Sequence, residues 1–97
     1  MDIKTVMDRE AATMAVSGSL NTNTSRELEE ELERVMSSAT SVTLDLADLE
    51  YISSAGLRVV LGAQKRLGAG NLTLKNVQES VQEVLEITGL SDILTIE

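Results

Sequence analysis

Residues 48–61 read DLEYISSAGLRVVL, and this stretch decides the fold because it changes from an apolar strand to an amphipathic helix. Two serines, Ser53 and Ser54, stand at the change. A serine at a helix start accepts a hydrogen bond from a backbone N–H two or three residues later. We therefore predict that Ser54 caps the helix, with the N–H of Gly56 or Leu57 as the donor.

The chain after the serines alternates between helix and strand. A helix is expected over residues 55–67, followed by Gly68, which is suited to end it. The apolar side of this helix consists of Leu57, Val60, Leu61, Gln64 and Leu67. Residues 71–76, 79–90 and 93–97 are typical of a strand, a helix and a final strand.

The chain before the serines gives a strand and a helix. Residues 41–49 contain alternating apolar side chains, which predict a strand with one face in the core. Residues 21–38 predict a helix whose buried stripe consists of Leu28, Leu32, Val35 and Met36. Thr24 or Ser25 is expected to cap this helix, and Glu27 would complete a capping box with Thr24.

The N-terminal segments complete the fold prediction. Residues 3–8 and 11–17 alternate in the manner of a β-hairpin, which Gly18 is expected to end. The resulting order is ββαβαβαβ. It predicts an α/β fold with a mixed, largely parallel β-sheet and helical crossovers, in a single domain over residues 1–97.

Composition excludes several classes of function. The chain contains no His and no Cys, so Ser-His-Asp triads, thiol nucleophiles and His/Cys zinc sites cannot be built. No acidic stretch has the spacing of a calcium-binding EF-hand loop. We therefore expect neither a metal nor another cofactor, and we expect the protein not to be an enzyme.

Charge and hydropathy limit the partners and the location. The formal net charge of −8 disfavours nucleic acid and anionic membranes as partners, because both bind basic surfaces. A protein partner or a small molecule remains. The chain has no long apolar run and no signal-peptide pattern at its N-terminus, so we expect a cytoplasmic protein.

Ser54 has three possible roles. It can cap the helix, and it is poorly suited to be a nucleophile because no histidine can take its proton and Gly-x-Ser-x-Gly is absent. It can also be a substrate for phosphorylation. A phosphate at a helix N-terminus meets unpaired N–H groups and the positive end of the helix dipole, so the fold would tolerate it while a docked partner would not.

The motif around the serines resembles a known family. Residues 45–67, DLADLEYISSAGLRVVLGAQKRL, closely resemble the signature of the STAS-domain anti-sigma-factor antagonists of bacteria. The segments SGSLNTNTSRELEEEL at 17–32 and EITGLSDILTIE at 86–97 extend the resemblance over nearly the whole chain.

The resemblance implies a phosphorylation switch. In the family, the serine two residues before the glycine of the motif is phosphorylated, and that position is Ser54. An anti-sigma factor with serine kinase activity adds the phosphate from ATP, and a metal-dependent serine phosphatase removes it. The unphosphorylated antagonist binds the anti-sigma factor and frees the sigma factor. This chain departs from the family at Ser53 and Asn21, where the family often has Asp.

The helix itself suggests a partner surface. Val59 lies off the apolar stripe, so we predict that it is an exposed apolar residue beside Ser54. Arg58 is expected to be exposed one turn from that serine. Gly56 is expected to allow close approach of the helix start. The complete predicted surface consists of Asn21, Ser53, Ser54, Ala55, Gly56, Arg58 and Val59. The free chain is expected to be a monomer. The alternative function is a STAS scaffold or interaction subunit without a phosphorylation switch.

Overall fold

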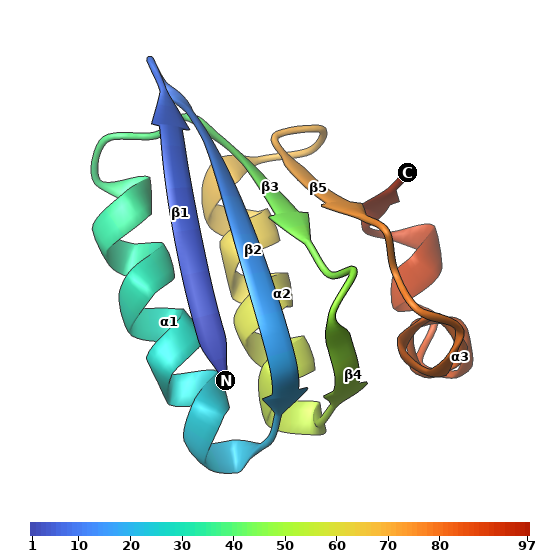
Figure 1. The fold of residues 1–97 in the computed structure, drawn as a ribbon. Coiled ribbons are helices and arrows are strands. Elements are labelled where there is room, and N and C mark those ends of the chain that lie inside the picture. The colour runs from blue at the N-terminus through green and yellow to red at the C-terminus, as the bar shows by residue number, and fades with distance from the viewer.

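The structure is a computed structural model that describes residues 1–97. Its elements follow one another in the order β1 (Asp2–Asp8), β2 (Ala11–Leu20), α1 (Thr22–Met36), β3 (Ser41–Asp45), β4 (Leu49–Ile52), α2 (Ser54–Leu67), β5 (Leu72–Lys75), α3 (Glu79–Ile87), the 3-10 helix η1 (Leu90–Asp92) and β6 (Thr95–Ile96) (Figure 1).

One sheet organises the molecule. Its strands lie in the order β1-β2-β3-β5-β6, and β4 pairs with the far end of β2. Only the β1–β2 pair is antiparallel, and helices connect most of the parallel strands. The predicted α/β fold with a mixed, largely parallel sheet and helical crossovers is therefore confirmed.

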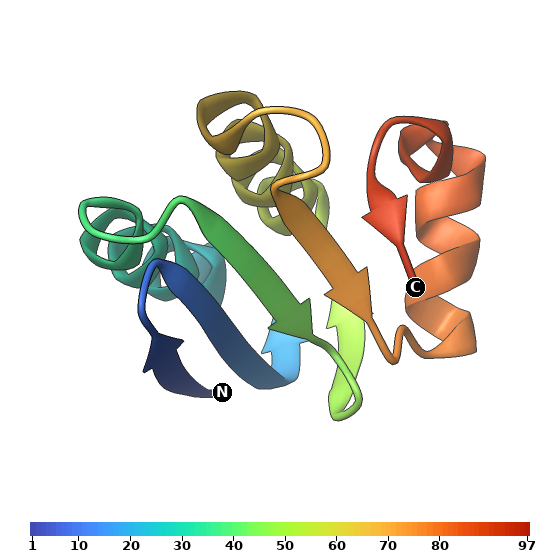
Figure 2. The ribbon, with the colours of Figure 1, turned by 90° about the horizontal axis from the view of Figure 1, so that it is seen from above.

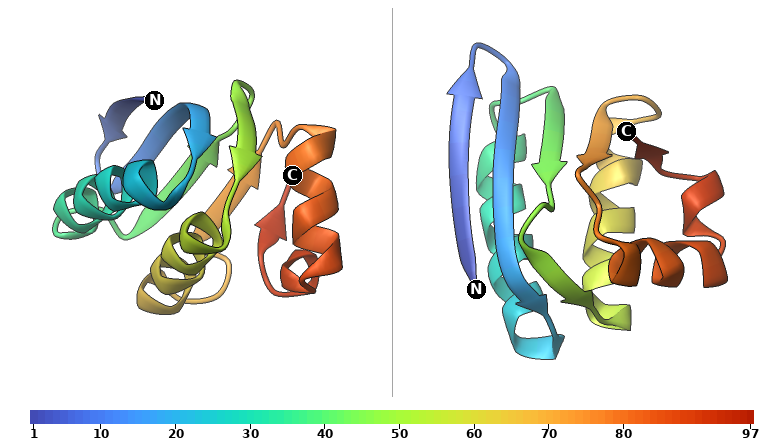
Figure 3. Two further views of the ribbon diagram at one scale, coloured as in Figure 1. Left: turned by 90° about the horizontal axis from the view of Figure 1, so that it is seen from below. Right: turned by 45° about the vertical axis from the view of Figure 1, so that its right-hand side comes forward.

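The helices occupy two places around the sheet. Figures 2 and 3 show α1 and α2 side by side over one face, whereas α3 lies beyond β5, next to β4 and η1. The core between the sheet and the helices is aliphatic and includes Met14, Leu44 and Leu32. The predicted stripe of α1 is confirmed, because Leu28, Leu32 and Val35 are buried and Met36 packs against the core.

Strand β2 pairs with three other strands. Residues Ala11–Ser17 pair with β1, Ala11–Ala15 pair with β3, and Gly18–Leu20 pair with β4. The register shifts between Gly18 and Ser19, and Gly18 has a φ of 95°. The prediction that Gly18 ends the hairpin is confirmed for the pairing, because β1 pairs with β2 only as far as Ser17. Strand β2 itself continues to Leu20, since a glycine can adopt this backbone angle inside a bulged strand.

The segment before the serines contains two strands where the sequence predicted one. Strand β3 ends at Asp45, and the chain turns at Ala47 before β4 begins at Leu49. The backbone N–H of Gly18 donates to the carbonyl of Asp48 at 2.9 Å, which fixes the start of β4 against β2. Strand β4 then leads directly into the two serines.

Candidate binding site at the starts of α1 and α2

Two helix starts lie side by side at the carboxyl ends of two neighbouring strands. Strands β2 and β4 are parallel neighbours, with Leu20 opposite Ile52, and each is followed at once by a helix. The backbone N–H of Ser53 donates to the carbonyl of Leu20 at 2.8 Å, which ties the two strand ends together. The first turns of α1 and α2 are therefore neighbours, at the lower end of the molecule in Figure 1.

Ser53, and not Ser54, caps α2. Ser53 is extended (φ −90°, ψ 173°), and its Oγ accepts from the N–H of Gly56 at 3.2 Å. The prediction that Ser54 is the cap is wrong, because β4 ends at Ile52 and Ser54 is already the first helical residue. Gly56 was one of the two predicted donors. Ser54 is exposed, and its hydroxyl takes no part in the cap.

Asn21 caps α1. Its Oδ1 accepts from the N–H groups of Asn23 and Thr24, both at 2.9 Å, while Thr24 Oγ1 accepts from the N–H of Asn21 at 2.8 Å. Thr24 Oγ1 also donates to the carbonyl of Ser19 at 2.6 Å. The prediction of Thr24 or Ser25 as the cap, with Glu27 in the capping box, is wrong because the helix begins directly after β2, three residues earlier.

The two helix starts approach closely at Gly56. A Cβ at this position would lie 2.9 Å from Ile52 Cγ1, 3.0 Å from Leu20 Cβ and 3.3 Å from Ser25 Oγ. The expected close approach at Gly56 is confirmed. Ser25 is only 2% exposed, and its Oγ has no hydrogen-bond partner. Sequence reasoning missed this buried hydroxyl, since Ser25 was interpreted as a cap.

The surface between the helix starts is hollowed. The lining residues are Thr22, Ser25, Arg26, Glu29, Ala55, Arg58 and Val59. Arg58 is exposed as predicted, whereas Val59 and Ala55 are half-buried. The prediction of an exposed Val59 is wrong, because its side chain packs against the core from the groove between the helices.

The hollow continues as a groove along the two helices. Farther from the helix starts, α1 lines the groove with Glu33 and Met36, and α2 lines it with Gly62 and Arg66. Glu29, Arg58 and Val59 belong to both parts. Of the predicted binding residues, Ala55, Arg58 and Val59 thus line one continuous depression, whereas Asn21 and Ser53 act as caps beside it.

One ion pair fixes the middle of α1. Arg34 and Thr5 both donate hydrogen bonds to the Glu31 carboxylate, at 2.7–2.8 Å. These two donors, Arg34 first, lower the pKa of Glu31 to about 2. The Glu31–Arg34 contact is the salt bridge of this chain, so Arg26 and Arg58 are not engaged in one.

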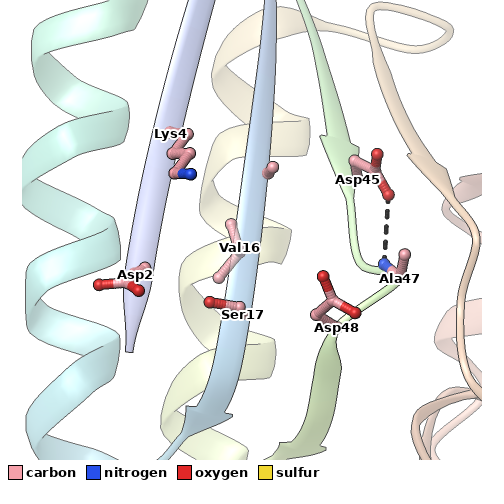
Figure 4. A pocket seen from close by; sticks show the side chains of 8 residues that line it. Asp2, Lys4, Val16, Ser17, Asp45, Ala47 and Asp48 are labelled. Carbon is pink, nitrogen blue, oxygen red and sulfur yellow. Dashed lines mark hydrogen bonds between the residues drawn. The ribbon is translucent and has the colours of Figure 1, made fainter.

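A second depression lies on the face of the sheet without helices. Asp2, Lys4, Asp45 and Asp48 line it, and Figure 4 shows the hydrogen bond from the Ala47 N–H to Asp45. The pKa of Asp45 is lowered because Asn76 and then the Ala47 N–H donate to its carboxylate. No group of three acidic side chains is arranged to hold a metal ion.

None of the helices is both long enough and apolar enough to span a bilayer.

Comparison with known proteins decides the family. The family model described as "Mlab, STAS domain" matches residues 3–95. The chain is 42% identical over 84 residues to BtrV of Bordetella bronchiseptica, assigned as an anti-sigma factor antagonist, covering 84% of this chain and 72% of BtrV. It is 31% identical over 99 residues to the anti-sigma-B factor antagonist of Staphylococcus epidermidis, covering 99% and 92% of the two chains. The chain belongs to the STAS-domain family of anti-sigma-factor antagonists.

Solved structures share this STAS fold. An anti-sigma factor antagonist from Mycobacterium paratuberculosis superposes with a TM-score of 0.87 at 20% identity, covering 98% of this chain and 83% of that one. The anti-sigma factor antagonist SpoIIAA in its unphosphorylated form gives a TM-score of 0.84 at 21% identity, covering 99% and 88% of the two chains. The family resemblance in the sequence is thus confirmed by both sequence and fold.

Proposed function

We propose that this STAS domain binds an anti-sigma factor with serine kinase activity, releases that factor's sigma factor, and is switched off by phosphorylation of Ser54. The names of its sequence relatives support the antagonist role. The observation that carries the switch is the exposed hydroxyl of Ser54, which the neighbouring Ser53 leaves available by taking over the cap.

The chemistry at Ser54 is phosphoryl transfer in the active site of the partner kinase. Ser54 Oγ attacks the γ-phosphorus of ATP, a new O–P bond forms, and the bond to the β-phosphate oxygen breaks to release ADP. The hydroxyl proton passes to a base of the kinase. A serine phosphatase reverses the state by hydrolysis, which transfers the phosphoryl group to water.

The position of Ser54 makes the phosphate compatible with the fold. The first N–H groups of a helix lack intrahelical acceptors, and those of Ser54 and Ala55 donate to no backbone carbonyl. A phosphate there carries about −1.5 to −2 charges at neutral pH and is stabilised by these donors and by the helix dipole. A partner docked over the same turn would have to bury that charge, which is costly.

The partner surface consists of the two helix starts and the hollow between them. Asn21, Ser54 and Arg58 are its exposed members, and Ser53, Ala55 and Val59 are half-buried. Gly56 contributes indirectly, by allowing the helix starts to approach. We propose that the free domain acts as a cytoplasmic monomer and that the anti-sigma factor covers this surface.

A STAS scaffold without a phosphorylation switch is the second candidate. One observation favours it: Ser53 and Asn21, which stand at positions where the family often has Asp, are both used as structural caps. The loss of two carboxylates beside Ser54 removes charges that a kinase or a phosphatase could recognise.

A kinase reaction tests the proposal. The purified protein is incubated with ATP, magnesium and the anti-sigma kinase of the same genome, and the masses of the intact chain and of the peptide containing Ser53 and Ser54 are measured. We expect one phosphate on Ser54, none in Ser54→Ala, and unchanged stoichiometry in Ser53→Ala. The phosphorylated protein should no longer bind the kinase. A folded protein that binds the anti-sigma factor but is never phosphorylated would favour the scaffold.

A further inference from the structure

Two arginines border the hollow between the helix starts without ion pairs. Arg26 lies in the first turns of α1 and Arg58 in those of α2, and both line the hollow. The chain carries only 8 basic residues against 16 acidic ones, so two unpaired cations at one place are a notable concentration of positive charge. Glu29 is the one acidic residue in the lining, and it forms a salt bridge with neither.

Arg58 is placed to reach Ser54. The two residues are four apart in α2, and residues with this spacing lie one above the other on a helix surface. Helical side chains lean towards the N-terminus, so the Arg58 side chain extends over the turn that begins with Ser54. Ala55, the next residue after Ser54, lines the same hollow as Arg58 and Arg26.

A buried hydroxyl in the hollow has no partner. Ser25 belongs to the lining, is 2% exposed, and its Oγ makes no hydrogen bond. Such buried groups are normally paired, and an unpaired one calls for an explanation. Ser25 is thus an unused donor where the two helix starts meet, in a hollow that Arg26 and Arg58 also line. These are the groups with which proteins bind phosphate.

We propose that Arg58, Arg26 and the N–H groups at the start of α2 form an intramolecular binding site for the phosphoryl group of Ser54. This inference rests on the proposed function, since it assigns what holds the phosphate of that switch. Phosphorylation then changes the partner surface twice. It adds a dianion, and it withdraws two cations that an acidic partner segment would otherwise contact.

The test uses a protein that carries phosphoserine at position 54 by genetic encoding, so no kinase is needed. The phosphorus-31 chemical shift is followed from pH 4 to pH 8 at low ionic strength, because salt screens exposed charges. The second pKa of an unperturbed phosphoserine is about 6. We expect Arg58→Gln to raise the measured pKa by about half a unit, and Arg26→Gln to raise it by less.

Arg66→Gln is the matched control. It removes one positive charge from the same helix, but Arg66 lies two turns farther from Ser54 than Arg58 does. In Arg58→Lys the second pKa of the phosphoserine should return part of the way to the wild-type value. Lysine restores the positive charge but not the planar guanidinium group with its paired donors. Equal pKa values in Arg58→Gln and Arg66→Gln would overturn the site. That result is distinct from a failure of the proposed function, which appears as a missing kinase reaction on the unmodified serine.

Discussion

The starts of α1 and α2 occupy equivalent places in the fold but use their polar groups differently. Both follow parallel strands that end side by side. At α1, Asn21 and Thr24 cap each other and Thr24 also binds the end of β2. At α2, one bond of 3.2 Å from Gly56 to Ser53 is the only side-chain cap.

The difference separates a helix start whose capping side chains are engaged from one with an exposed, unpaired hydroxyl, which is what the proposed phosphorylation requires. At α1 both capping side chains, those of Asn21 and Thr24, are engaged in hydrogen bonds, so a modification of either would break bonds that hold the helix start. At α2 the exposed Ser54 hydroxyl and two N–H groups are unpaired, so a phosphate adds interactions and breaks none. Five predictions test this comparison.

The largest effect is expected where the two helix starts touch. Gly56→Ala places a Cβ 2.9 Å from Ile52 Cγ1, so the strand end or the helix must shift. We expect the free energy of unfolding to fall by about 1–3 kcal/mol in urea titrations. Gly62→Ala is the control: its Cβ would meet nothing within 4 Å, and it should stabilise the helix by about 0.5–1 kcal/mol. Equal effects would contradict the close approach.

The two caps should differ in their contribution to stability. Asn21→Ala removes an acceptor of two backbone N–H groups and is expected to cost about 1–2 kcal/mol. Ser53→Ala removes one longer bond and should cost about 0.5–1 kcal/mol. Thermal and urea unfolding measure both. A larger loss of stability in Ser53→Ala than in Asn21→Ala would contradict the comparison, because it would show that the cap of α2 contributes more than the cap of α1.

Acid should weaken the contact that anchors α1 to β1. The pKa of Glu31 is lowered to about 2, so its ion pair stabilises the fold fully above pH 4.5 and loses this effect as the pH falls towards 2. The Arg34 side chain is largely exposed, so solvent screening keeps this contribution small. The stability difference between wild type and Glu31→Gln should shrink between pH 6 and pH 3. A stability difference that stays constant over this range would contradict the contribution of the Glu31–Arg34 pair.

The unpaired Ser25 hydroxyl should lower stability. Ser25→Ala removes a buried polar group without breaking a hydrogen bond and is expected to stabilise the unphosphorylated protein by about 0.5–1 kcal/mol. Ser80→Ala provides the contrast, because the Ser80 hydroxyl donates to the carbonyl of Glu50 at 3.0 Å. That variant should be destabilised slightly. A destabilised Ser25→Ala would show that the hydroxyl has a partner in solution.

The smallest effect on stability is expected at Ser54. Ser54→Ala should change the free energy of unfolding by less than about 0.5 kcal/mol, because the hydroxyl is exposed and does not cap. Ser54→Asp places an anion at the helix start and should stabilise α2 by a few tenths of a kcal/mol. Calorimetry measures both. A fall of about 1 kcal/mol in the free energy of unfolding of Ser54→Ala would instead indicate that Ser54 caps α2.

The sequence predicted the architecture well because hydrophobic periodicity determines it. The buried stripe of α1 and the alternation of Val42 and Leu44 in β3 are repeated signals that a single substitution does not hide. Strand β4 was missed as a separate element because its four residues are buried only at Leu49 and Ile52, which is not a period of two.

Caps were predicted less well, for a different reason. Several adjacent residues can each supply an oxygen to a helix start, as with Ser53 and Ser54 or with Asn21, Thr24 and Ser25. The end point of the preceding strand determines which of these residues becomes the cap. That end point depends on how the strand pairs with a distant segment of the chain. The half-burial of Val59 likewise depends on α1, which lies about thirty residues away in the chain.

Strand β2, which pairs with β1, β3 and β4, has a consequence for the proposed phosphorylation of Ser54. Its amide protons should exchange with deuterium only through global unfolding, since opening β2 disrupts three neighbours at once. The carbonyl of Leu20, at the end of this strand, accepts a hydrogen bond from the backbone N–H of Ser53. The phosphate proposed for Ser54 would therefore sit on a rigid platform, and we expect the two proposed states to differ in charge and not in fold.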